Sequence, residues 1–418
     1  MSKITKIIGR QVFDSRGNPT VEAEVHLSDK TKASAIVPSG ASTGAFEAYE
    51  LRDGNKNYFS GKSVLKAVKN INTVINKNLK NIKAGDQKKI DQILLKIDGT
   101  DNKRRLGANA LLAASLATSK AAAGSKKIEL YQHLGKKFLL PKPQMNIING
   151  GAHADNNLRI QEFMIRPDSA KNFMDAMEKG FLVIQNLKKI LQSKNLLTNV
   201  GDEGGFAPSI NSNEEALEMV VEAIEKSKLK PGKDINICLD VAANELINKE
   251  GKYSLNSSKF ISVDESINYY KKLISKYPIK SIEDPFAEND WSAWCKLTKE
   301  IGKNVQIVGD DLFVTNVARL KRGIAEKSAN SILVKVNQIG TLTETLNVIE
   351  LAKKNNFSTV ISHRSGDTED TFIADLAVAT QSTQIKTGSL SRSERVAKYN
   401  RLLRIEEQLG KSVKIAKI

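Results

Sequence analysis

The sequence predicts an α/β protein in which a small N-terminal α+β domain precedes a C-terminal TIM-type (β/α)8-like barrel. Two patterns lead to this prediction. Early in the chain, strand-like stretches precede helical ones, and in its second half short apolar runs alternate with helix-length stretches. The length of 418 residues also suits two domains. We place these domains at residues 1–135 and 136–418, because a turn-rich segment follows residue 135.

The N-terminal domain is expected to contain three strands followed by three helices. Apolar residues at every second position from Val21 to Leu27 are typical of a half-buried strand. The expected strands are residues 4–13, 21–27 and 33–37, and the expected helices lie near 61–80, 86–97 and 106–124. A Gly-rich polar loop, residues 38–44, separates the two groups. Strands grouped before helices favour an α+β domain.

The barrel is predicted from apolar runs that are separated by helical segments. Continuous apolar strands of this kind belong to parallel sheets, since both of their faces are buried. The runs are residues 235–239, 279–282, 305–308, 331–334, 358–362 and 383–385, with helices expected at 314–328, 341–355 and 368–381. Six such units, together with residues 142–230, are enough to close a barrel.

The composition excludes membrane, disordered and disulfide-stabilised classes. The chain is 40% hydrophobic and 27% charged, as soluble globular proteins are. No run approaches the roughly 18 apolar residues of a membrane span, and the first ten residues lack the apolar core of a signal peptide. Two cysteines, Cys238 and Cys295, cannot form a disulfide framework. We therefore expect a cytoplasmic protein with no membrane span.

A net charge of +17 raises the question of nucleic-acid binding. Lys and Arg number 64 against 47 Asp and Glu, but the Lys residues are dispersed along helical faces and form no motif. We interpret the charge as a solvated surface that attracts small anionic substrates, without specific nucleic-acid recognition.

Each apolar run is followed by an ionisable residue that a core would not accommodate. The carboxyl ends of barrel strands meet at one face, and active sites form there. The residues in question are Asp240, Glu283, Asp310, Lys335, His363 and Lys386. A single carboxylate in this position is more often a helix N-cap, but six in series favour a functional site.

Three of these residues are carboxylates, namely Asp240, Glu283 and Asp310. Oxygen donors that converge in this way repel one another unless a hard cation lies between them, and without Cys or His ligands that cation should be Mg²⁺. Their neighbours Asp284 and Asp311 could support the ligands, or could simply be exposed. Lys335 near a metal could act as a base, or could pair with a carboxylate.

Further candidates follow the last strands and lie in two Gly-rich loops. Arg364, Ser365 and Lys386 have donors that suit phosphate or carboxylate oxygens. Residues 200–208 contain Glu203, a candidate acid flanked by glycines, and residues 149–163 contain His153, Gln161 and Glu162. A lone histidine is more often structural, but the glycines beside His153 favour a mobile loop over a site.

At this point the sequence resembles the enolase (phosphopyruvate hydratase) family nearly from end to end, and its bacterial form most closely. The resemblance rests on long ordered motifs: DSRGNPTVE (14–22), VPSGASTG (37–44), NGGAHADNN (149–157), VGDEGGFAP (200–208), IEDPF (282–286), GDDLFVTN (309–316), LVKVNQIGTLTET (333–345), SHRSGDTED (362–370) and RVAKYNRLLRIEE (395–407). It implies a glycolytic hydro-lyase that converts 2-phospho-D-glycerate reversibly into phosphoenolpyruvate and water. It also implies that the N-terminal domain caps a barrel whose first strands are irregular.

The resemblance also implies roles for individual residues and two Mg²⁺ ions per site, the second bound with substrate. Asp240, Glu283 and Asp310 match the ligands of the first ion, and Ser39 matches the protein ligand of the second. Lys335 matches the base and Glu203 the acid, which other carboxylates would keep protonated, with Glu162 and His363 beside them. The residues that match substrate-binding positions are His153, Gln161, Glu162, Lys335, Ser362, His363, Arg364, Ser365 and Lys386.

Two residues depart from the family pattern, and two other functions compete with this one. Asn244 stands where Ser is usual, and Thr383 where Gly is usual. The competitors are a related enzyme that acts on a carboxylate without phosphate, and a binding role for RNA or a host-surface partner, which some members add to catalysis. The resemblance further implies a homodimer, or an octamer in some members, and it allows surface or secreted forms.

Overall fold

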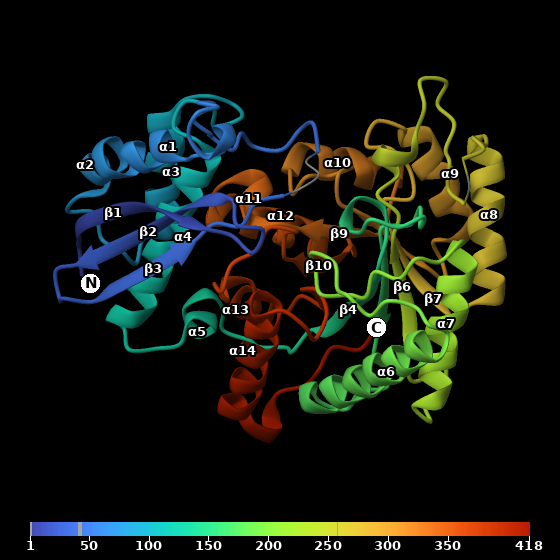
Figure 1. Cartoon of the computed structure of the whole chain (residues 1–418). Coiled ribbons are helices and arrows are strands. Elements are labelled where there is room, and N and C mark those ends of the chain that lie inside the picture. Colours follow the sequence, from blue (N-terminus) through green and yellow to red (C-terminus); the bar gives the residue numbers. More distant parts are fainter. Residues whose placement is uncertain (1, 41–43, 257) are drawn as a thin grey trace.

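The computed structural model describes residues 2–40, 44–256 and 258–418 and contains two domains (Figure 1). The N-terminal domain has an antiparallel sheet in the order β1 (Ile4–Phe13), β2 (Pro19–Leu27) and β3 (Lys32–Ile36). Every second residue of β2 from Val21 to Leu27 is buried, as the alternation predicted. The sheet lies at one side of the molecule, away from the barrel helices α7 to α9.

Helices cover one face of this sheet. They are α1 (Leu65–Asn70), a π-helical turn (Ile71–Ile75), α2 (Asn76–Leu79), α3 (Gln87–Asp98), α4 (Ala108–Ser125) and α5 (Leu130–Leu134). Helix α4 is rich in Ala and buried almost all round, because it packs against β2 and β3 on one side and against α11 and α12 of the barrel on the other. Small side chains allow both contacts, and α4 thereby joins the two domains.

The expected helix at 61–80 is divided by the π-helical turn. The side chains of Asn72 and Asn76 accept hydrogen bonds from the backbone N–H groups of Gly9 and Ile7, both 2.8 Å long. Ile71 lies directly over Gly9, where no larger residue would fit. These contacts hold the segment against β1, and the widened turn accommodates them.

The second domain is a closed eight-stranded barrel, which confirms the predicted fold class. Its strands follow the order β10-β11-β4-β5-β6-β7-β8-β9. Their bounds are β4 (Lys142–Asn149), β5 (Glu162–Arg166), β6 (Asn236–Asp240), β7 (Ile279–Glu283), β8 (Gln306–Gly309), β9 (Ser331–Val334), β10 (Ser358–Ser362) and β11 (Gln384–Lys386). Strand β5 runs antiparallel to both β4 and β6. A loop without an α-helix joins β4 to β5, and such a link suits antiparallel strands. The first strands are therefore irregular, as expected.

Helices surround the barrel and begin at residues that the sequence marks as caps. Ser262 and Glu265 form a capping box, and the Asn316 side chain accepts from two N–H groups of α10. The helices are α6 (Phe173–Ser193), α7 (Asn213–Lys226), α8 (Val263–Lys276), α9 (Trp291–Ile301), α10 (Val317–Glu326), α11 (Val336–Ile339), α12 (Leu342–Lys354), α13 (Phe372–Ala379) and α14 (Ser393–Leu409). None of the helices in the described part of the chain is long and apolar enough to cross a bilayer.

The domains meet at the barrel mouth and where α5 packs against α13. Ser39 and Gly366 form a β-bridge, and Asp370 accepts hydrogen bonds from the Ile36 N–H and from Lys120 of α4. These contacts bring the beginning of the 38–44 loop to the ends of the barrel strands. Residues 41–43 of that loop lie outside the described residues.

The junction itself offers a test of this packing. A Cβ atom on Gly135, directly after α5, would overlap the carbonyl oxygen of Ala379 in α13. We expect Gly135→Ala to lower the free energy of unfolding by about 1–3 kcal/mol, because backbone must move to make room. The control Lys136→Ala, at an exposed neighbour, should change it by no more than about 0.5 kcal/mol. Urea denaturation measures both, and an unchanged stability of the Gly135 variant would contradict the packing.

Candidate active site

The carboxyl ends of the barrel strands surround a polar cavity. Almost every residue singled out from the sequence lines it: His153, Gln161, Glu162, Glu203, Asp240, Asp310, Lys335, Ser362, His363, Arg364, Ser365 and Lys386. Ala242, Asp284 and Asp311 also line the cavity. Glu283 and Ser39 do not, although both are buried.

Lys386, at the end of β11, is bound by carboxylates from three other strands. Its Nζ lies 3.0 Å from Asp240, 2.9 Å from both oxygens of Glu283 and 3.2 Å from Glu162. Asp240 and Glu283 face each other in the register of β6 and β7. Burial lowers the pKa of Lys386, but the surrounding carboxylates outweigh it and raise that pKa well above its usual range. Lys386 is therefore an ammonium ion.

Lys335 forms the second buried ion pair, with Asp310. The other oxygen of Asp310 accepts a hydrogen bond of 2.8 Å from Gln338. Burial lowers the pKa of Lys335, yet the charge of Asp310 outweighs it, and the pKa is raised. A neutral base at this position therefore requires that Asp310 be engaged by another cation.

The donor atoms of the site suit a hard divalent cation. Oxygens of Asp284, Asp310 and Asp311 lie within 4.8 Å of one another, while Asp240 and Glu283 share Lys386. Of the predicted ligands Asp240, Glu283 and Asp310, only Asp310 thus belongs to this compact group. Each of the three predicted ligands is instead paired with a lysine ammonium group. Burial and the neighbouring carboxylates raise the pKa of Asp311 to about 7. Carboxylate oxygens without Cys or His are the donor set that Mg²⁺ prefers.

Two backbone N–H groups fix the arrangement of the acidic group. The Asp284 carboxylate accepts from the N–H groups of Asp310 and Asp311, both at 2.9 Å. Asn244 donates to Asp311 at 2.8 Å and accepts from the Glu288 N–H at 2.9 Å. Asn244, which stands where the family usually has Ser, thus has a hydrogen-bond partner for both its amide nitrogen and its amide oxygen. Thr383, the other departure, precedes β11 and lies toward the opposite end of the barrel.

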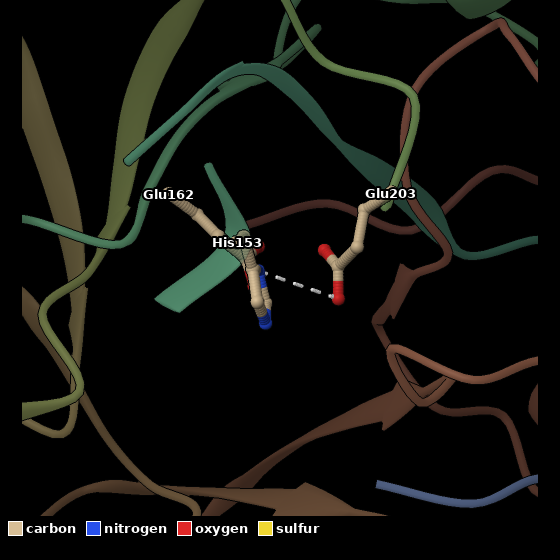
Figure 2. A group of neighbouring side chains, drawn as sticks. All are labelled: His153, Glu162 and Glu203. Carbon is tan, nitrogen blue, oxygen red and sulfur yellow. Dashed lines mark ion pairs between the residues drawn. The ribbon is translucent and has the colours of Figure 1, made fainter. Parts of the chain in front are cut away.

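A second group joins His153, Glu162 and Glu203 across the cavity (Figure 2). His153 Nδ1 lies 3.5 Å from Glu162 and 3.8 Å from Glu203, and His363 Nε2 lies 3.3 Å from Glu203. Burial and the charge of Glu203 raise the pKa of Glu162 well above its usual range. Burial also raises the pKa of Glu203, but the facing imidazoles reverse this and hold it well below its usual range.

The charge state of this pair differs from the sequence-based expectation, in which other carboxylates keep Glu203 protonated. In the structure burial and the charge of Glu203 raise the pKa of Glu162, while that of Glu203 is lowered, so a proton shared by the pair favours Glu162. The reason is that both histidines face Glu203, an arrangement that the separate loops 149–163 and 200–208 did not reveal.

Arg364 is held by a residue that the sequence analysis missed. Its guanidinium group donates to both oxygens of Glu47, at 2.9 and 3.1 Å, and to Asn337 at 3.0 Å. Burial lowers the pKa of Arg364, but the carboxylate of Glu47 raises it overall. Glu47 belongs to the N-terminal domain, and its only signal in the sequence was its position shortly after the 38–44 loop. The guanidinium group of Arg364, which we expect to bind an anion of the substrate, is thus already paired with the carboxylate of Glu47.

Ser39 does not line the cavity that holds the other predicted metal ligands Asp240 and Asp310. Its hydroxyl donates to Asp14 at 3.4 Å and accepts from the guanidinium groups of Arg16 and Arg52, also at 3.4 Å. Two positively charged groups beside a hydroxyl disfavour cation binding there. The assignment of Ser39 as a metal ligand stays a prediction.

Comparison with known proteins identifies a family for each of the two domains. The family described as "Enolase, N-terminal domain" matches residues 4–134, and the family described as "Enolase, C-terminal TIM barrel domain" matches residues 137–417. The enolase of Pelagibacter ubique (strain HTCC1062) is 63% identical over 420 residues, which cover 100% of both chains.

The two carboxylate sets predict different effects on metal binding. If Asp240, Glu283 and Asp310 hold the ion, Asp240→Asn should weaken Mg²⁺ binding by at least the roughly 10- to 100-fold typical of groups that only support a ligand. Asp311→Asn should then have a smaller effect. Calorimetric titration with Mg²⁺ measures both, with the exposed Asp264→Asn as control. If Asp311→Asn lost more Mg²⁺ affinity than Asp240→Asn, the metal site would lie instead at Asp284, Asp310 and Asp311.

Proposed function

The chain belongs to the enolase family and is a glycolytic hydro-lyase that converts 2-phosphoglycerate reversibly into phosphoenolpyruvate, and we propose that the cavity at the barrel mouth performs this reaction. One observation carries the proposal. Lys335, which follows β9, and Glu203, in the loop 200–208, reach the same cavity from separate elements. A dehydration needs one group to remove a proton and another to assist the departing hydroxide.

We assign the removal of the C2 proton to Lys335. The lysine is buried, so its ammonium form is stable only while a carboxylate faces it. If Asp310 held a divalent cation instead of Lys335, burial would favour the neutral amine. The backbone N–H of Lys335 donates to Thr315 at 2.9 Å, which holds the base in position. Binding of a cation by Asp310 would thus make the neutral amine of Lys335 available as the base.

We assign the delivery of a proton to the leaving hydroxide to Glu203, with Glu162 as its partner. The two carboxyl groups face His153 and hold one proton between them, which resides on Glu162 before substrate binds. Asn146 donates to Glu203 at 3.2 Å and orients its carboxylate. Transfer of the shared proton to Glu203 precedes its use as an acid.

The anionic groups of the substrate are matched by the basic residues of the cavity. Arg364 and Ser365 are proposed to bind the phosphate, which then replaces Glu47 as the partner of the guanidinium group. Lys386 is proposed to bind the carboxylate. Gln161, His153, Ser362 and His363 also line the cavity.

Enolase identity implies a divalent metal, and we propose two Mg²⁺ ions, the first held by Asp240, Glu283 and Asp310 and the second bound with substrate. Such ions supply positive charge beside the substrate carboxylate as C2 loses its proton. A Lys or His base combined with one or two Mg²⁺ ions is the established arrangement of enolase-superfamily sites, and the proposed pairing of Lys335 with two ions follows it.

The remaining proposals concern location and assembly. A glycolytic role supports the cytoplasm, and the dispersed Lys residues support no specific nucleic-acid partner. Exposed aromatic rings of Phe13, Tyr58 and Phe59 lie together, with centroids 5.8 and 4.6 Å apart, and they support a contact between two copies in a homodimer. We place the domain boundary at residues 135 and 136, which the turn after α5 supports.

The two proton transfers can be separated by experiment. Lys335→Ala should lose both dehydration and exchange of the C2 proton with deuterated solvent, whereas Glu203→Gln should lose dehydration and keep exchange. Each loss of dehydration should be roughly 100- to 10,000-fold, as for other acid–base groups. A coupled assay with 2-phosphoglycerate measures dehydration, and proton NMR measures exchange.

The controls for this test are chelation and an exposed lysine. Excess chelator should abolish activity in the unmodified protein and Mg²⁺ should restore it. Lys296→Ala, at the surface, should behave normally. Full activity in chelator, or equal loss of exchange in both variants with the fold intact, would contradict the assignments.

The surroundings of Ser39 generate a further prediction. Although two guanidinium groups face its hydroxyl, Ser39 is proposed as a ligand of the second ion, so we expect Ser39→Ala to raise the Mg²⁺ concentration that the reaction requires. Ser42→Ala, in the part of the same loop outside the described residues, is the matched comparison. An unchanged Mg²⁺ requirement in the Ser39 variant would contradict its assignment as a ligand.

A further inference from the structure

Arg395 is a fully buried arginine that none of the proposed roles uses. It lies in the first turn of α14, within the motif RVAKYNRLLRIEE, and its side chain is 0% exposed. Its guanidinium group donates to the carbonyl oxygens of Arg364, Ser365 and Asp202, at 2.6, 2.7 and 3.1 Å. These residues belong to the two loops that carry His363 and Glu203. The side chain of Arg395 therefore joins the loop that carries His363 to the loop that carries Glu203.

The same guanidinium group contacts the imidazole of His363. Arg395 Nη1 lies 2.6 Å from His363 Nδ1. Arginine can only donate a hydrogen bond, so Nδ1 must accept it and cannot carry a proton. A neutral imidazole then carries its proton on Nε2, which faces the Glu203 carboxylate at 3.3 Å.

His363 is neutral, which makes the position of its single proton decisive. Burial lowers its pKa to about 4, against the attraction of Glu203, and Arg395 lowers it further. The charged groups that face it are Glu203, Arg395 and Asp367. Its backbone N–H donates to the carbonyl oxygen of Lys386 at 3.0 Å.

We propose that Arg395 is a positioning residue that holds His363 in the Nε2-protonated tautomer, so that an N–H group rather than a lone pair faces Glu203. This inference rests on the proposed function, since Glu203 is the group that it orients. In the other tautomer, the lone pair of Nε2 would face a carboxylate and the Nδ1 proton would face a guanidinium N–H. Both contacts would be repulsive, and Arg395 excludes them together.

The proposal concerns orientation and the distribution of a proton, not contact with substrate. With Nε2–H on one side and the Asn146 amide on the other, Oε2 of Glu203 faces two donors. Oε1 is left toward His153, at 3.8 Å. The carboxyl group therefore receives the shared proton on the oxygen that is not already engaged.

Nitrogen NMR of the full chain, labelled at its histidines and supplied with Mg²⁺, tests the proposal. The ring nitrogens of a neutral histidine have distinct shifts that identify the tautomer, and His363→Gln identifies the signals of His363 among the four histidines. The unmodified protein should show protonated Nε2 and unprotonated Nδ1. Protonated Nδ1 there would overturn the proposal, whatever the variants do.

The variants separate positioning from folding. Arg395→Met should shift His363 toward protonated Nδ1 and lower kcat by about 10- to 100-fold, a lower range than for loss of an acid–base group itself, with KM within about twofold. Arg395→Lys, which keeps a donor, should restore the tautomer. Lys398→Met is the control for burial, because Lys398 is almost as buried on α14 and bonds to carbonyl oxygens of Thr368 and Glu394 and to Asp367, but not to His363.

The outcomes are distinguishable from those of the proposed function. An unchanged tautomer and kcat in Arg395→Met would overturn the proposal, and so would an equal change in Lys398→Met. If the Arg395→Met chain does not fold, the Arg395→Lys spectrum and that of the unmodified protein decide alone. The predicted tautomer combined with full dehydration activity in Glu203→Gln would support the proposal and overturn the role of Glu203.

Discussion

The interaction between Lys386 and the carboxylates of Asp240, Glu283 and Glu162 is the constraint on which the barrel mouth depends. A buried carboxylate without a partner costs several kcal/mol, and the described part of the mouth holds at least six acidic side chains. Lys386 contacts three of them from the far side of the barrel, and Lys335 pairs with Asp310. Strands β5, β6, β7 and β11 can therefore close around this group without leaving an isolated charge.

The fold followed from the sequence because its patterns are local. Apolar runs bounded by ionisable residues predicted the strands from β6 onward to within about two residues, the usual uncertainty of element ends. The position of Asp240, Glu283, Lys335 and Lys386 at strand ends then followed from the geometry of parallel barrels. Family resemblance, rather than periodicity, led to the irregular first strands.

Pairings between distant parts of the chain could not be predicted in this way. Glu47 binds Arg364 across the domain junction, and Asn244 connects Asp311 with the Glu288 backbone. The ionised state of Glu203 depends on two histidines from different loops. No spacing or composition encodes such contacts, since each depends on where the backbone brings together residues far apart in sequence.

The closure of the barrel has a consequence for synthesis of the protein. Strand β4, at residues 142–149, has β11 as its parallel neighbour, and β11 ends only at Lys386. A chain that grows from its N-terminus therefore holds β4 to β10 as an open sheet until the last three dozen or so residues emerge. During that interval the edges of β4 and β10 are unpaired, and Asp240 and Glu283 lack their ammonium partner. Exposed edges of this kind favour association with other chains, so the nascent protein is most vulnerable to aggregation just before its final strand arrives.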